Sequence, residues 1–268
     1  MQRSILVGNM IGFGALIFSI LIDSSFNYHA IGAFFNFSAM LIIFGGITGA
    51  IVISFPPDQL REVPVALRKA FLEFEDANLV EMSRDLIQMA NQSRKEGILS
   101  LEASANEIKD AWLRMGITLV VDGVNRDLLK SIMESRLDEY SEKTRVGAKI
   151  FTQLGGFAPT LGIIGTVMGL VHMLAHMEDS SKLGAAISVA FLATFWGILS
   201  ANLIFLPIGN RVKAKDDEMI RTRVAMIEGI LSLQAGESVR LLEERLKVFM
   251  SNEEEKRFAE SLVEGAGK

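Results

Sequence analysis

The stretch GGFAPTLGIIGTVMGL, residues 155–170, decides the fold of this chain, because it is apolar and yet rich in residues that weaken helices in water. It holds five glycines, one proline and two threonines, and it carries no charge. In a bilayer, helices gain little hydrophobic free energy by touching one another, so tight packing depends on small side chains at the contact. The stretch therefore predicts a membrane-spanning helix that lies close against a neighbouring helix.

The composition of the whole chain indicates a membrane part and a water-facing part. Hydrophobic residues make up 50% of the 268 residues and the mean hydropathy is +0.33, yet 22% of the residues are charged. We expect these two kinds of residue to be segregated. The absence of cysteine excludes disulfides and cysteine-ligated metals. The net charge of −5 argues against nucleic acid as a partner.

Four stretches without Asp, Glu, Lys or Arg are long enough to span a hydrocarbon core, which needs about 20 helical residues. They are residues 4–22, 24–57, 150–177 and 183–210. No cleavage pattern of a secretory signal follows the first stretch, so we expect it to be retained as a membrane helix.

The basic residues predict the orientation of these spans. Of the 27 Lys and Arg residues, only Lys182 lies between spans three and four, and none lies between spans one and two. By the positive-inside rule, both termini and the large central loop face the cytoplasm. Apolar residues recur three and four positions apart in the loop and in the tail, which indicates helices there.

The predicted fold is therefore an all-α membrane protein with four transmembrane helices and a helical cytoplasmic domain, in which spans three and four extend into the cytoplasm. The expected segments are transmembrane helices 1 and 2 at residues 1–57, a helical loop domain at 58–148, transmembrane helices 3 and 4 at 149–210, and a helical tail at 211–268.

Spans three and four each carry one threonine on a stripe of small apolar residues. At about 100° per residue, Pro159 and Thr166 share one face of span three, and Thr194 lies on a similar stripe of span four. One interpretation is helix packing, with the hydroxyls bonded to their own backbone carbonyls. The other is an ion path lined by the two hydroxyls. The glycines that permit close approach of a neighbour are Gly162, Gly165 and Gly169.

The spans lack the charged side chains that carry protons or bind ions inside most transporters. The ionisable side chains of span three are His172 and His176, which we expect at its outer end, in the interface. If the chain conducts ions, a partner must supply the carboxylate. No nucleophile–base pair, phosphate loop or metal cluster is evident in the sequence, so we expect no enzymatic activity and no cofactor, only a transported ion.

The spans resemble those of the MotA/PomA family of flagellar motor stator proteins, within the MotA/TolQ/ExbB ion-channel superfamily. GGFAPTLGIIGTVMGLVHML and LGAAISVAFLATFWGILSANLIFLPI look like the family's spans three and four. FFNFSAMLIIFGGITGAIVISFP resembles its second span, and RKEGILSLE resembles its cytoplasmic R-x-x-G-x-L-x-L-E segment. The resemblance covers nearly the whole chain.

The resemblance implies a stator subunit of the bacterial inner membrane that serves flagellar motility and chemotaxis. Five copies would form a ring around two copies of a MotB-type protein, which has a single span, binds peptidoglycan and brings an intramembrane aspartate. Ion flow would rotate this lipid-embedded homopentamer against a protein of the rotor's switch complex.

The resemblance also assigns residues to these tasks. Pro159 and Pro207 match two prolines that couple conformational change to ion flow, and Thr166 and Thr194 match the pore-facing threonines. Arg94 and Glu102 match a charged pair that meets the rotor, and we expect them to project from a loop around Gly97. Without the resemblance, the sequence favours the interpretation that Arg94 and Glu102 lie at a solvent-exposed helix end.

One departure from the family bears on the ion. Asn36 stands where relatives begin the second span with an acidic residue, so an outer carboxylate that would attract cations is absent at that position. The neutral Asn36 and the sequence GTVMGLVHML in span three both favour protons over sodium as the transported ion.

Three other functions compete with a stator. A proton-channel energiser of the ExbB/TolQ type would have three spans and an outer N-terminus. A self-contained transporter would need a charged or polar substrate site within the spans. A structural scaffold would show no ion dependence with any partner.

Overall fold

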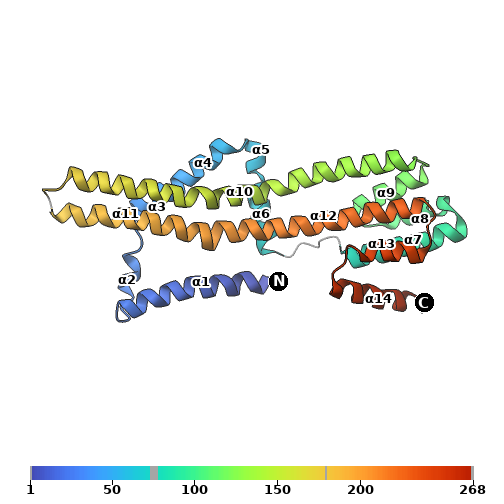
Figure 1. Cartoon of the computed structure of the whole chain (residues 1–268), viewed down its shortest axis with the longest axis horizontal. Helices are drawn as coiled ribbons and strands as arrows, with labels where there is room; N and C mark the ends of the chain where they lie inside the picture. Colours follow the sequence, from blue (N-terminus) through green and yellow to red (C-terminus); the bar gives the residue numbers. More distant parts are fainter. Residues whose placement is uncertain (1, 73–77, 179, 267–268) are drawn as a thin grey trace. The chain divides into compact units, whose positions relative to one another are not determined.

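The computed structural model describes residues 2–72, 78–178 and 180–266 (Figure 1). Within these ranges every regular element is helical and no strand occurs, which confirms the all-α prediction. The chain divides into two compact units, one made of residues 1–73 and 145–214 and the other of residues 74–144 and 215–268. Two long helices, α10 and α12, contribute residues to both units.

The first unit contains the apolar helices. Its elements are α1 (Gln2–Asp23), α2 (His29–Gly32), α3 (Phe37–Met40), the π-helical turn η1 (Leu41–Gly45), α4 (Gly46–Ser54), α5 (Pro57–Leu60), α6 (Glu62–Phe71), the end of α10 (Arg126–Ala175), α11 (Ser180–Ser200), the π-helical turn η3 (Ala201–Phe205) and the start of α12 (Leu206–Gln234). Among the described residues, three helical stretches are long and apolar enough to cross a membrane, namely Phe37–Ser54, Arg126–Ala175 and Leu183–Gln234. A shorter apolar stretch covers Val7–Asp23 in α1.

The helices of spans three and four continue beyond their apolar stretches, as the sequence predicts. Helix α10 runs for 50 residues without interruption, although Pro159 lies inside it. Asn125 precedes this helix, and its side-chain oxygen accepts a hydrogen bond from the Leu128 amide at 2.9 Å, so that a first-turn donor is satisfied. Helices α11 and α12 are joined through η3 without leaving a helical path.

The second unit is a bundle of amphipathic helices around a core of large aliphatic side chains. Its elements are α7 (Leu79–Glu96), the 3₁₀ turn η2 (Ile98–Ser100), α8 (Leu101–Glu107), α9 (Ala111–Val121), the start of α10, the end of α12, α13 (Val239–Lys247) and α14 (Asn252–Ala266). Leu86, Ile117 and Ile230 are among its fully buried residues, and Phe258 of α14 is buried with them. Asn78, Asp110 and Ser238 cap the starts of α7, α9 and α13 with their side chains, as Asn125 does for α10.

One charged cluster lies inside this second unit. Arg223 Nη1 donates to both carboxylate oxygens of Asp110, at 2.8 and 2.9 Å. The guanidinium also lies 5.3 Å from the ring centre of Trp112 and 5.8 Å from that of Tyr140. Because the pair is largely buried and charge-assisted, it joins the start of α9 to α12 more firmly than an exposed ion pair would.

Candidate functional site: a glycine-lined helix contact and a charged turn

Helices α10 and α11 approach each other so closely that backbone lies against backbone. A methyl group added at Gly197 would lie 2.6 Å from the carbonyl oxygen of Ala158, and one at Gly162 would lie 3.1 Å from Thr194 Cα. At Gly169 an added methyl would lie 2.9 Å from the carbonyl oxygen of Ala186, and at Gly165 it would collide with the methyl group of Ala193. The glycines therefore set the distance between the two helices. In Figure 1 the two helices run side by side over this stretch.

Thr166 of α10 and Thr194 of α11 meet at this contact. Their hydroxyl oxygens are in direct hydrogen-bond contact. Thr166 Oγ1 lies 3.1 Å from the carbonyl oxygen of Gly162 and 3.2 Å from that of Ala190. Thr194 Oγ1 lies 3.3 Å and 3.4 Å from the same two oxygens. Each threonine is thus within reach of a carbonyl on its own helix and of one on the facing helix.

Counting protons shows what this cluster can do chemically. Four oxygen atoms converge, from two hydroxyls and two carbonyls, but each hydroxyl has only one proton to donate. Lone pairs therefore remain in excess, in a half-buried setting of glycine and alanine. A cluster of this kind favours a hydrated proton or a small cation over an anion. The hydroxyl–carbonyl distances agree with the interpretation of the threonines as helix-packing residues, and the ion path stays a prediction.

Pro159 and Pro207 occupy different positions in their helices. Pro159 is an interior residue of α10, and it removes the amide that would bond to the carbonyl of Gly155. Pro207 is the second residue of α12, and Leu206 separates it from the π-helical turn η3. A π-helical turn before a proline gives the ring room, because the preceding backbone is locally widened.

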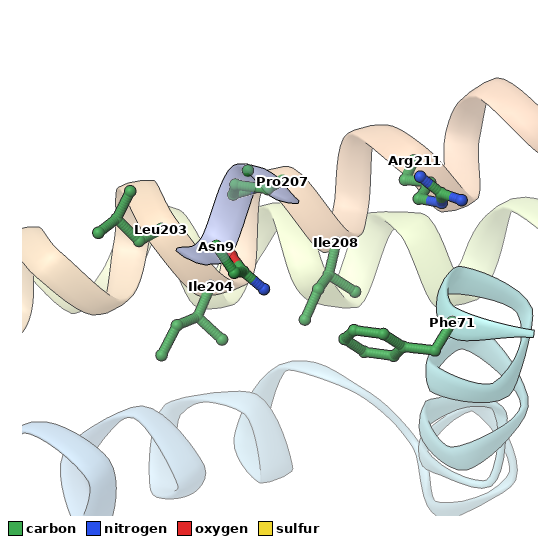
Figure 2. A pocket seen from close by; sticks show the side chains of 8 residues that line it. Asn9, Phe71, Leu203, Ile204, Pro207, Ile208 and Arg211 are labelled. Atoms are coloured by element: carbon green, nitrogen blue, oxygen red, sulfur yellow. The ribbon is translucent and has the colours of Figure 1, made fainter. Parts of the chain in front are cut away.

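Pro207 also borders a cleft of about 410 Å³ within the first unit. Figure 2 shows Ile204 and Ile208 of η3 and α12 pointing into this cleft, with Phe71 of α6 entering from the other side. Asn9 of α1 closes it above, next to Pro207. Pro207 is also exposed, so the start of α12 is not packed on all sides.

Asn36, the residue that departs from the family pattern, is the N-cap of α3. Its side-chain oxygen accepts a hydrogen bond from the Ala39 amide at 3.1 Å. The neutral amide therefore performs the capping that an aspartate would perform, without a charge. The indole of Trp196 donates to the carbonyl oxygen of Phe34 at 2.7 Å and ties α11 to the same segment. This tie was not predicted, although a tryptophan in a span signals that its N–H needs an acceptor.

Arg94 and Glu102 lie in the second unit, at the two sides of a tight turn. The expectation that they project from a loop needs correction. Arg94 belongs to the last turn of α7 and Glu102 to the first turn of α8, because only Gly97 and the short η2 separate the two helices. Gly97 has φ +87°, a left-handed conformation that favours glycine. Both charged side chains are exposed.

Behind this turn, α7 and α8 enclose a small polar cleft of about 250 Å³, bordered by Asp85, Gln92 and Ser104. Partial burial raises the pKa of the Asp85 carboxyl, and the neighbouring Arg84 only partly opposes this effect. Among the described residues, no group of three or more His, Asp or Glu side chains could hold a metal ion.

Comparison with known proteins gives consistent relatives. Residues 104–225 match the model of the MotA/TolQ/ExbB proton channel family. The chain is 34% identical to Motility protein A of Bacillus subtilis, over 97% of this chain and 95% of that protein. It is 30% identical to the chemotaxis protein PomA of Vibrio alginolyticus, over 94% of this chain and 96% of that protein. The structure of the flagellar MotAB stator complex from Bacillus subtilis matches with a TM-score of 0.83 and 34% identity, over 95% of this chain and 98% of that one.

Proposed function

The chain belongs to the MotA/TolQ/ExbB proton channel family, and from this membership we propose how it couples ion flow to rotation. It is a MotA-type stator subunit of the flagellar motor that takes part in an ion channel, and it is not an enzyme. One observation carries the mechanism, namely a hydroxyl–carbonyl cluster at a glycine-lined helix contact in spans that contain no carboxylate.

A MotB-type protein is the partner, and the stator is an oligomer of both chains. We propose that five copies of this chain surround two copies of the partner. Because no span of this chain carries an acidic residue, the partner's intramembrane aspartate would be the group that takes up the ion. The partner's peptidoglycan-binding part would hold the complex in position while the ring turns.

In this proposal Thr166 and Thr194 line the ion path next to the partner's aspartate. The four oxygens with two protons can solvate an ion while it leaves or joins a carboxylate. Protons are the proposed ion. The neutral Asn36 cap supports this choice, since it offers no carboxylate that would collect sodium at the outer end.

Pro159 and Pro207 would convert occupancy of this site into movement of the long helices. Each proline removes one helix-stabilising hydrogen bond, so the helix bends there at lower free-energy cost than elsewhere. The cleft beside Pro207 supports the proposal for α12, because bending there does not require a packed core to open.

Arg94 and Glu102 would pass the movement to the rotor. They flank one exposed turn, with Arg94 in the last turn of α7 and Glu102 in the first turn of α8, and both side chains are exposed. Opposite charges on a transient contact chiefly govern register and rate of encounter. In this proposal the second unit is the part of the chain that contacts the rotor protein of the switch complex.

The proposed topology has four spans, with α1 as the first, in the bacterial inner membrane and surrounded by lipid. Both termini and the second unit would face the cytoplasm, as the distribution of Lys and Arg indicates. With a net charge of −5 we propose no nucleic-acid partner.

The test is complementation of a flagellated strain that is non-motile because its own stator genes are deleted, using this chain with its MotB-type partner. We expect rotation in sodium-free buffer and arrest by a protonophore. Rotation that needs sodium and survives the protonophore would overturn the choice of ion. No rotation under any ion gradient, with both proteins assembled in the membrane, would overturn the proposed coupling.

A further inference from the structure

A large apolar side chain is exposed at the centre of the charged turn. Leu99, in η2, keeps 74% of its surface accessible, and its neighbour Ile98 keeps 37%. Leu101, two residues later, is fully buried in the core of the second unit. One leucine of this short segment therefore supports the fold, whereas Leu99 does not.

The turn that carries Leu99 is held rigid. Gly97 turns the chain at φ +87°, and Ser100 Oγ donates to the Gly97 carbonyl at 2.7 Å. Gln92 Nε2 donates to the carbonyl oxygen of Ser100 at 3.0 Å, and Ser104 Oγ donates to Gln92 Oε1 at 2.9 Å. Leu99 is thus presented in a fixed position, so little conformational entropy would be lost when a partner covers it.

Charged side chains flank Leu99 on both sides. The exposed residues Arg94, Lys95 and Glu96 end α7, and the exposed Glu102 lies in the first turn of α8. Single exposed leucines are common on protein surfaces and have no meaning by themselves. Here the leucine lies on a fixed turn between charges of both signs, which is the arrangement of an interface hot spot within a polar rim.

Charges alone would make a weak contact. Exposed ion pairs contribute little to affinity and act mainly on the rate of encounter and on register. A contact that transmits force must also resist separation, and burial of an apolar side chain provides this without depending on salt.

We propose that Leu99 is the apolar anchor of the contact between this subunit and the rotor protein. The matching surface of the rotor protein would be an apolar recess bordered by charges of opposite sign to Arg94 and Glu102. This inference rests on the proposed rotor contact of that charged pair and adds a residue of a different chemical kind.

Photo-crosslinking in motile cells tests the proposal directly. The photoreactive residue p-benzoylphenylalanine replaces Leu99 in the full chain, co-expressed with its partner, and the crosslinked product is identified with an antibody against the rotor protein. We expect a crosslink to the rotor protein. Val248 is 79% exposed in the same unit, and the same substitution there should give none. A crosslink from position 99 to a second copy of this chain would overturn the proposal, because Leu99 would then be a subunit contact.

Substitution separates the anchor from the charges. Leu99→Asn keeps the approximate size but removes the apolar character, and it should weaken the rotor contact about tenfold or more and reduce torque strongly. Leu99→Met should retain most torque, and Val248→Asn should change nothing. Normal torque in Leu99→Asn together with a defect in Glu102→Lys would refute the anchor and keep the rotor contact. Normal torque in both would refute the rotor contact itself. A fall in chain level, as expected for Leu101→Ala, would make Leu99 a folding residue and refute the anchor.

Discussion

The two units of this chain pack their helices in opposite ways. In the first unit, α10 and α11 meet through glycine, alanine and threonine, and backbone carbonyls lie at the contact. In the second unit, leucine, isoleucine, methionine and Phe258 fill a core between amphipathic helices. The difference follows from the surroundings, since burial of large apolar side chains is favourable in water and almost neutral in lipid.

This comparison also separates where function can reside. In the first unit the carbonyls of the polar cluster lie at the glycine-lined contact, so a change at a contact glycine should disturb the packing and the cluster together. In the second unit the exposed turn is distant from the core contacts that stabilise it, apart from Leu101. Substitutions at the contact glycines of the first unit should therefore affect assembly and ion flow together, whereas substitutions on the exposed turn of the second unit should leave its stability unchanged.

The largest effect is expected from Gly197→Ala. The new methyl group would lie 2.6 Å from the carbonyl oxygen of Ala158, and a backbone atom cannot turn away as a side chain can. We expect loss of the assembled stator complex, measured as its yield by size-exclusion chromatography in detergent. Gly156→Ala on α10 is the matched control, because nothing lies within 4 Å of its added methyl. Equal yields for both variants would mean that close approach of the two helices is unnecessary.

The second effect concerns the core of the second unit. Leu86 is 1% exposed, and Leu86→Ala should destabilise this unit by about 2–5 kcal/mol, because it removes buried methyl groups and leaves a cavity. Hydrogen exchange of α7 amides in the intact complex measures this loss. Ile53→Ala in α4, at 88% exposure, should leave the stability of its helix unchanged. A larger loss at Ile53 than at Leu86 would reverse the proposed contrast.

The third prediction concerns Thr194→Val, which should change the stability of the complex little but reduce ion flow strongly. Thr194→Val keeps the shape but removes a hydrogen bond, so we expect a loss of about 1 kcal/mol at most and normal assembly. Ion flow and torque should fall sharply, because the oxygen cluster is broken. If Thr166 and Thr194 act as one unit, the double variant should be about as inactive as either single one. Additive losses of ion flow would show two independent sites.

Much of this arrangement could be predicted from the sequence, and the reasons are physical. Glycine spacing and the absence of charge indicated a tight membrane contact, and Gly97 indicated a helix end. The direct contact of Thr166 with Thr194 could not be predicted, since it depends on the relative rotation of two helices. The exposure of Leu99 could not be predicted from the sequence either. Leu99 and Leu101 are both apolar, and only the turn at Gly97 decides which one is buried.

The smallest effect concerns pH and the second unit. Burial opposes ionisation of Glu254, but hydrogen bonds from Ser251 and the nearby Arg221 outweigh it and lower the pKa of this carboxyl. A lowered pKa in the folded state means that the stabilisation is present above the pKa of the unfolded chain, about 4.3, and is lost as the pH falls through the folded value. Acidification should therefore weaken the attachment of α14, and Glu254→Gln should remove this pH dependence. Hydrogen exchange of α14 at several pH values measures it, and identical profiles for both proteins would contradict the assignment.

Ion flux through reconstituted vesicles tests the central claim most directly, namely that this chain provides the oxygen-lined path and its partner provides the carboxylate. Proton flux is compared among vesicles holding this chain alone, the complex with its MotB-type partner, and the same complex carrying Thr194→Val. We predict no flux above empty vesicles for the chain alone, clear flux for the complex, and strongly reduced flux for the variant. Flux from the purified chain alone, or undiminished flux in the variant, would contradict the account.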